Sequence, residues 1–93
     1  MKKSEIIKME RIFKGVANHW RIEILDCINR HNAICVEELS ERLNCNYKTL
    51  SEHIRRLKLA GLIYKKYKGQ RVEHSISPYG KKILETIKTF TYS

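Results

Sequence analysis

The chain has 93 residues and a formal net charge of +9, from 19 Lys and Arg against 10 Asp and Glu. That length predicts a single domain, residues 1–93, with one modest core. No stretch has the length and apolar character of a membrane-spanning helix, and the charged start lacks a secretory hydrophobic segment. We therefore expect a cytoplasmic domain with no membrane association.

The three cysteines, Cys27, Cys35 and Cys45, are an odd number and form no C-x-x-C pair. That spacing argues against a disulfide framework and against a structural zinc site, and it favours a reducing compartment. We expect no cofactor and no bound metal.

The positive charge is concentrated in the second half of the chain. Residues 1–46 carry 8 Lys and Arg against 7 Asp and Glu, whereas residues 47–93 carry 11 against 3. A basic surface confined to one part of a domain is typical of a protein that binds a polyanion.

Two amphipathic helices are predicted in the first third of the chain. The first runs from about Glu5 to Lys14, with Ser4 as its N-cap, and Gly15 should end or loosen it. The second runs from His19 to Arg30 behind Asn18, and residues 33–35 then form a short extended stretch.

Residues 36–60 predict two helices joined by a tight turn. Asn44 tolerates the left-handed conformation that such a turn needs, and Asn46 can cap the second helix. Apolar residues recur at helical spacing on both sides of the turn: Val36, Leu39 and Leu43, then Leu50, Ile54 and Leu57. This pattern is typical of a helix-turn-helix, whose second helix fits the major groove of DNA.

A β-hairpin and a last helix follow. Residues 62–67 and 71–76 favour strands and flank a short loop containing Gly69. Ser77 can then cap a helix that has Pro at its first position and covers residues 78–90. The fold class is therefore mainly α with a small β-hairpin, in the order α-α-β-α-α-β-β-α.

This order resembles that of winged helix-turn-helix proteins, and over residues 12–85 the chain is most similar to ArsR-type transcriptional regulators. The resemblance implies a helix-turn-helix at 36–60, a wing at 62–76 and a dimerisation helix at 78–90. It is carried by the segments Phe13 to Leu25, Leu39 to Leu43, Thr49 to Leu57 and Leu59 to Ile63. Ser77 to Lys81 is similar to the start of the last helix in MarR-type regulators.

The predicted DNA contacts lie on the second helix of the helix-turn-helix and on the wing. The N-terminal end of that helix should reach base edges, and its arginines should reach phosphates. Glu52 would repel phosphates unless it accepts from a cytosine or pairs with an arginine. The candidates are Asn46, Tyr47, Lys48, Thr49, Ser51, Glu52, Arg55 and Arg56 on the helix, and Lys65, Lys66, Lys68 and Arg71 on the wing.

The first and last helices each carry an apolar stripe that a chain of this size has little core to cover. Pairing the stripes across a two-fold axis would give a homodimer. The expected interface residues are Ile6, Ile7, Met9 and Phe13 on the first helix, and Ile83, Leu84, Ile87 and Phe90 on the last.

Cys35 is a candidate redox residue. It lies at the start of a helix, where the helix dipole favours a thiolate, although Glu37 and Glu38 oppose that effect. Many ArsR-type proteins bind metals through a cysteine pair here, but Glu37 occupies the second position in this chain. A site made from Cys35 with His31 or Cys27 is the weaker alternative.

No catalytic motif is present, so we do not expect an enzyme. We expect a sequence-specific double-stranded DNA-binding regulator that acts as a homodimeric repressor. The alternative is a winged-helix module that docks protein or RNA.

Overall fold

The computed structural model describes residues 1–92. It contains five α-helices and one two-stranded antiparallel sheet, which confirms the predicted fold class. The elements are α1 (Lys3–Val16), α2 (His19–Arg30), α3 (Val36–Leu43), α4 (Tyr47–Leu59), β1 (Ile63–Lys68), β2 (Arg71–Ile76), α5 (Pro78–Thr89) and the 3-10 turn η1 (Phe90–Tyr92).

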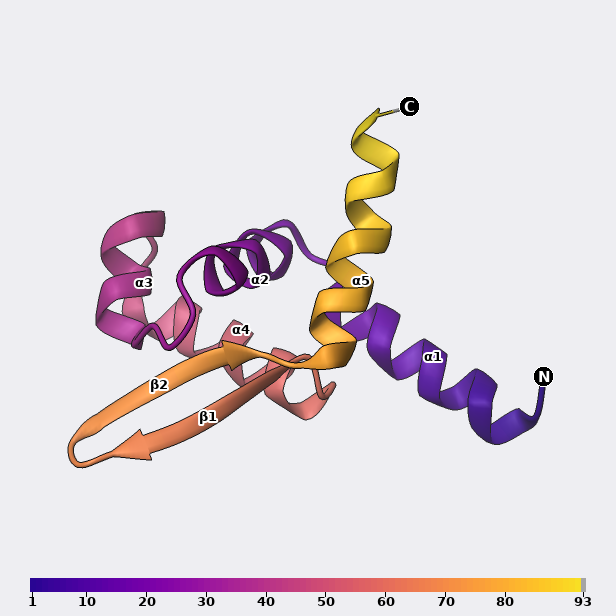
Figure 1. Cartoon of the computed structure of the whole chain (residues 1–93), viewed down its shortest axis with the longest axis horizontal. Helices are drawn as coiled ribbons and strands as arrows, with labels where there is room; N and C mark the ends of the chain where they lie inside the picture. Colours follow the sequence, from indigo (N-terminus) through magenta and orange to yellow (C-terminus); the bar gives the residue numbers. More distant parts are fainter. Residues whose placement is uncertain (93) are drawn as a thin grey trace.

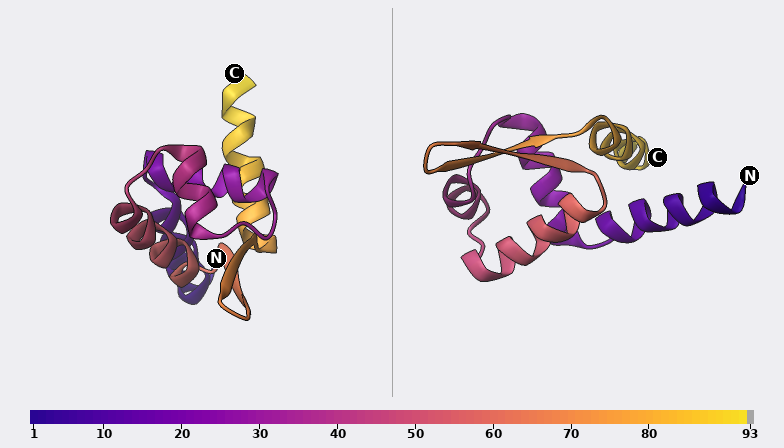
Figure 2. Two further views of the ribbon diagram at one scale, coloured as in Figure 1. Left: turned by 90° about the vertical axis from the view of Figure 1, so that its left-hand side faces the viewer. Right: turned by 90° about the horizontal axis from the view of Figure 1, so that it is seen from below.

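Helices α2, α3 and α4 form the body of the molecule (Figure 1). The hairpin extends from one side of this body, and α1 and α5 project from the other (Figure 2). None of the helices within residues 1–92 is long and apolar enough to cross a bilayer.

The start of α1 differs from the prediction. The N-cap is Lys2, whose backbone N–H donates to the Glu5 carboxylate at 3.0 Å. Ser4, the predicted cap, lies inside the first turn. The acid three residues after the cap therefore decides where the helix begins.

Of the two effects predicted for Gly15, an end of the helix is wrong, because α1 continues through Gly15 to Val16. A Cβ atom on Gly15 would lie 2.3 Å from the Cβ of Ala60, which caps the C-terminus of α4. Gly15 thus allows α1 and α4 to approach closely, a role that the sequence alone did not reveal.

The turn of the helix-turn-helix follows the prediction. Asn44 is left-handed, with φ of 49°. The Asn46 side chain accepts from the backbone N–H groups of Lys48 and Thr49, at 2.8 and 3.3 Å. Ser40 in addition donates to the carbonyl of Cys45 at 2.7 Å. These bonds fix the direction in which α4 leaves the turn.

The core lies where α2, α3 and α4 meet the base of the hairpin. Its fully buried side chains include Ile24, Leu25, Ile28, Leu39, Leu50, Ile54, Leu57, Leu62 and Ile63. The strands pair from Ile63 opposite Ile76 to Lys68 opposite Arg71. The predicted extended stretch joins them, since Ile34 and His74 exchange backbone hydrogen bonds of 3.2 and 2.8 Å.

Ser77 connects the base of the wing to α5. Its hydroxyl donates to the carbonyl of Gly61 at 2.7 Å and accepts from the N–H of Gly80 at 3.0 Å. The predicted cap is therefore correct, and it also holds α5 against the end of α4.

Candidate nucleic-acid interface

One face of α4 is exposed because the other supplies the core. Leu50, Ile54 and Leu57 are at most 1% exposed, which turns the polar positions between them outward. Tyr47 is 57% exposed, and Ser51 is half-buried. The other predicted contact residues of the helix-turn-helix are all exposed: Asn46, Lys48, Thr49, Glu52, Arg55 and Arg56.

Glu52 pairs with the two arginines of its own helix. Its carboxylate accepts from Arg55 at 2.8 and 3.0 Å and from Arg56 at 3.2 Å. These hydrogen bonds, Arg55 first, lower the pKa of Glu52 to about 2. Of the two roles that the sequence left open, the structure shows the ion pair, and the acid is compensated on this face of the helix.

The wing carries an exposed cationic edge. Lys66 and Lys68 are exposed, and Lys65 is half-buried. Lys68 lies beside Gly69, which makes the turn of the hairpin with φ of +61°. The ammonium group of Lys68 is 3.5 Å from the Glu73 carboxylate.

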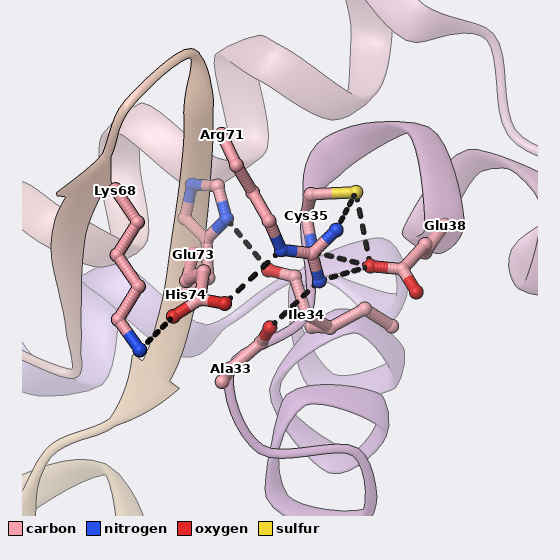
Figure 3. Close-up of polar contacts among 8 residues, drawn as sticks. All are labelled: Ala33, Ile34, Cys35, Glu38, Lys68, Arg71, Glu73 and His74. Carbon is pink, nitrogen blue, oxygen red and sulfur yellow. Dashed lines mark hydrogen bonds and ion pairs between the residues drawn. The ribbon is translucent and has the colours of Figure 1, made fainter.

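Arg71 is directed toward α3 and not outward from the wing (Figure 3). Its guanidinium donates to the Glu38 carboxylate at 2.6 Å and to the carbonyl of Ala33 at 3.1 Å. It also donates to Glu73 at 3.0 Å and approaches the Cys35 sulfur at 3.5 Å. We call this set of contacts the Arg71 network. The guanidinium group that was predicted to contact DNA is thus already hydrogen-bonded within the protein. The bonds to Glu38 and then to Glu73 raise the pKa of Arg71.

Cys35 is the N-cap of α3 and is only 7% exposed. Its thiol donates to Glu38 at 3.0 Å, and its backbone N–H donates to the same oxygen at 3.1 Å. Burial, with the Glu38 hydrogen bond next, raises the pKa of the thiol, whereas the two Cys35 bonds and Arg71 lower the pKa of Glu38 to about 2. Burial and the neighbouring acid thus oppose the thiolate that the helix dipole would favour at this helix start, and a redox role of Cys35 stays a prediction.

No group of three or more His, Cys, Asp or Glu side chains that could hold a metal ion is found within residues 1–92.

A groove of about 570 Å³ separates the wing from the N-terminal ends of α3 and α4. Tyr47 and Ser51 line it from α4, and Lys65, Gln70 and Arg71 line it from the wing. The structure thus brings predicted base-reading and wing residues to one concave surface, although they are about twenty positions apart in the sequence.

The predicted dimer stripes are only partly exposed. Ile6, Ile7, Phe13 and Phe90 are between 53% and 74% exposed, and Met9 and Ile87 are half-buried. Ile83 and Leu84 are 6% and 3% exposed and belong to this chain's own core, which contradicts their assignment to an interface. Helical periodicity identifies the apolar face of α5 but not which part of it the monomer already covers.

Comparison with known proteins places this geometry in a family. The sequence model of the HVO_A0114 family matches residues 16–87. The arsenic resistance transcriptional regulator ArsR1 of Pseudomonas putida is 31% identical over 74 residues, covering 80% of this chain and 58% of the relative. The transcriptional activator HlyU of Vibrio cholerae is 35% identical over 66 residues, covering 71% and 60%. The chain thus spans about three fifths of the length of these two curated relatives.

Solved structures agree with the sequence relatives. The structure of HlyU from Vibrio cholerae is 30% identical, covers 100% of both chains and superposes with a TM-score of 0.83. A homodimeric winged helix-turn-helix DNA-binding domain from Mycobacterium bovis is 22% identical, covers 95% of this chain and 82% of its own, and shares the fold with a TM-score of 0.85. The chain belongs to the HVO_A0114 family and is an ArsR-type winged helix-turn-helix protein.

Proposed function

We propose that this protein is a sequence-specific regulator of transcription that binds double-stranded DNA in the cytoplasm as a homodimer and acts as a repressor. The observation that carries the proposal is the groove at which the polar end of α4 and the cationic wing meet. One curated relative is named as a transcriptional regulator and the other as a transcriptional activator, which supports regulation of transcription as the class of function here.

The N-terminal half of α4 is proposed to enter the major groove. Tyr47, Lys48, Thr49 and Ser51 would face base edges, because the N-terminal residues of the second helix do so in this motif. Asn46 acts through its cap, which satisfies the first backbone N–H groups of α4 and orients the helix that enters the groove.

Arg55 and Arg56 lie farther along α4 and are proposed to contact phosphates. Glu52 holds both guanidinium groups on the exposed side of the helix. A DNA phosphate would replace Glu52 as the partner of part of these guanidinium groups. Because a phosphate contact is the same for every base, it would position the helix and carry little sequence information.

On the wing, we propose that Lys65, Lys66 and Lys68 contact the DNA backbone. Arg71 is given a different role from the one expected from the sequence. Since its donors are directed to Glu38, Glu73 and Ala33, it would hold the wing against α3 and set the width of the groove.

Dimerisation is proposed through the exposed parts of α1 and α5. Both helices project from the same side of the body (Figure 1), and four large apolar side chains on α1 and on the turn η1 after α5 are more than half exposed. The interface would contain Ile6, Ile7, Met9, Phe13, Ile87 and Phe90. A two-fold axis here would place the two α4 helices one DNA turn apart, about 34 Å, and match a palindromic site.

Sequencing genomic DNA that the intact protein captures from sheared fragments tests the proposal. Enrichment of a shared palindromic motif supports it, and a promoter reporter containing that motif should be less active when the protein is present. Capture without a shared motif would indicate a non-specific binder. No DNA capture would favour the protein- or RNA-docking alternative.

A further inference from the structure

A second concave surface lies where α1 crosses the C-terminal end of α4. It has a volume of about 200 Å³ and is lined by Arg11, Lys14, Gly15, Arg56, Leu59 and Ala60. Gly15 and Ala60 are the small residues at the crossing, whereas three long cationic side chains surround it. We call it the basic hollow.

A fourth cation, Arg21, adjoins the basic hollow from α2. It is 9% exposed, and its guanidinium donates to the carbonyl of Lys14 at 3.4 Å and to Nδ1 of His53 at 3.3 Å. Its Nε has no hydrogen-bond partner within residues 1–92. Both partners are neutral when His53 accepts this bond, so no carboxylate hydrogen-bonds to this buried charge.

The charges around Arg21 repel one another. Burial, and then the charge of Arg56, lowers the pKa of Arg21. Burial, Arg21 and Arg56 lower the pKa of His53 in the same way, which favours the neutral imidazole. A buried cation without a carboxylate is costly, and a nearby anion would relieve that cost.

The carboxylates close to the basic hollow do not balance it. Glu10 lies 3.6 Å from Lys14, and both side chains are more than half exposed. Glu52 accepts from Arg56 at 3.2 Å, but Arg55 shares the same carboxylate at 2.8 Å. Arg11 makes no salt bridge within residues 1–92. The hollow therefore keeps a net positive charge.

We propose that the basic hollow binds phosphates of the DNA backbone that flank the major groove entered by α4. This inference rests on the proposed function and adds a contact surface on α1, a helix to which only a dimer role had been given. Arg56 belongs both to the hollow and to the proposed phosphate-contacting side of α4, so the two surfaces are continuous. Guanidinium groups match phosphate geometry, and an acidic protein partner is the competing occupant.

The test is a salt titration of DNA binding with the double variant Arg11→Gln and Lys14→Gln. Each lost phosphate contact should flatten the slope of log K against log salt by about 0.9, so the slope of the double variant should be flatter by about 1.8. At low salt the variant should bind DNA roughly tenfold or more weakly than the wild type. Lys81→Gln with Lys82→Gln is the matched control, because both lysines are exposed on α5 outside the hollow. Thermal melting of each variant checks that the fold is intact.

A second experiment distinguishes direct contact with the flanking phosphates from long-range attraction. It uses duplexes in which these phosphates are replaced with neutral methylphosphonates. This replacement should weaken the wild type but hardly affect the Arg11 and Lys14 variant. If the variant and the control give the same slope, or if neutral phosphates weaken both proteins equally, the inference is wrong even though the protein binds DNA. A wild type that binds no duplex would instead refute the proposed function.

Discussion

The Arg71 guanidinium on β2 donates a 2.6 Å hydrogen bond to the Glu38 carboxylate on α3, and the two residues are 33 positions apart. The wing is therefore attached to the first helix of the helix-turn-helix by a charge-assisted bond (Figure 3). Ala33, left-handed with φ of 66°, presents its carbonyl to the same guanidinium. The orientation of the wing relative to α4 depends on this attachment.

Substitution of Arg71 separates wing positioning from phosphate contact. Arg71→Ala should weaken binding to all DNA sequences by a similar factor without flattening the salt dependence, because the guanidinium neutralises Glu38 and not a phosphate. Lys66→Ala, on the exposed edge, should flatten the slope by about 0.9. Fluorescence anisotropy over a range of salt concentrations gives both numbers. If Arg71→Ala also flattens the slope of log K against log salt by about 0.9, the Arg71 side chain leaves α3 and contacts DNA.

Acid should weaken the attachment in a defined pH range. Because the pKa of Glu38 is lowered to about 2, its contribution to stability is complete above the unfolded value of about 4.3 and is lost as pH falls toward 2. The melting temperature of the wild type should therefore fall more steeply between about pH 4.3 and 2 than that of Glu38→Gln. Glu41→Gln, an exposed site on the same helix, is the control. Parallel curves for the wild type and Glu38→Gln would contradict the assignment.

Gly15→Ala should destabilise the fold although alanine favours helices. The added Cβ would lie 2.3 Å from that of Ala60, so α1 or α4 would have to shift to make room for it. Overpacking typically costs 1–3 kcal/mol, so a net loss of about 1–2 kcal/mol is expected after the gain in helix propensity. Urea denaturation measures it. The double variant with Ala60→Gly should recover part of the loss, and simple additivity of the two changes would argue against the contact.

The proposed dimer is tested by placing a charge on its exposed stripe. Phe13 is 53% exposed on α1, so Phe13→Glu should leave the monomer folded but oppose burial of that surface against a partner. Light scattering should show a dimeric mass for the wild type and a monomeric mass for the variant at micromolar concentration. Tyr67→Glu, at a 70% exposed wing position, makes the same change in charge and should remain dimeric. A monomeric wild type would exclude this dimer.

Sequence predicted the parts of the fold that local chemistry determines. Asn44 and Asn46 specify the turn and the cap of α4 within a few residues, and Ser77 with Pro78 specifies the start of α5. Each prediction needed only the backbone preference of one residue or a hydrogen bond to a near neighbour.

The features that sequence missed depend on contacts between distant segments. The charge of Arg71 is visible in the sequence, but its direction depends on where α3 lies relative to the hairpin. Gly15 was predicted to end or loosen its helix, because its contact, Ala60, is 45 positions away and not visible in the sequence. In the same way, the burial of Arg21 beside His53 follows from the packing of α2 against α4, and no spacing rule predicts it.

The last prediction concerns the choice of DNA sequence. Substitutions at the α4 end of the groove, Tyr47→Ala, Lys48→Ala or Ser51→Ala, should change which bases are preferred, because these side chains are proposed to meet base edges. Lys66→Ala should instead weaken binding about equally for all sequences, because backbone contacts carry no base information. Selection from a random duplex library, followed by sequencing, compares the preferred motifs of the four variants and the wild type. A bidentate base contact is typically worth 1–3 kcal/mol of discrimination, so a lost contact should appear as a degenerate position in the motif. An unchanged motif in all three α4 variants would mean that this helix end does not read the bases.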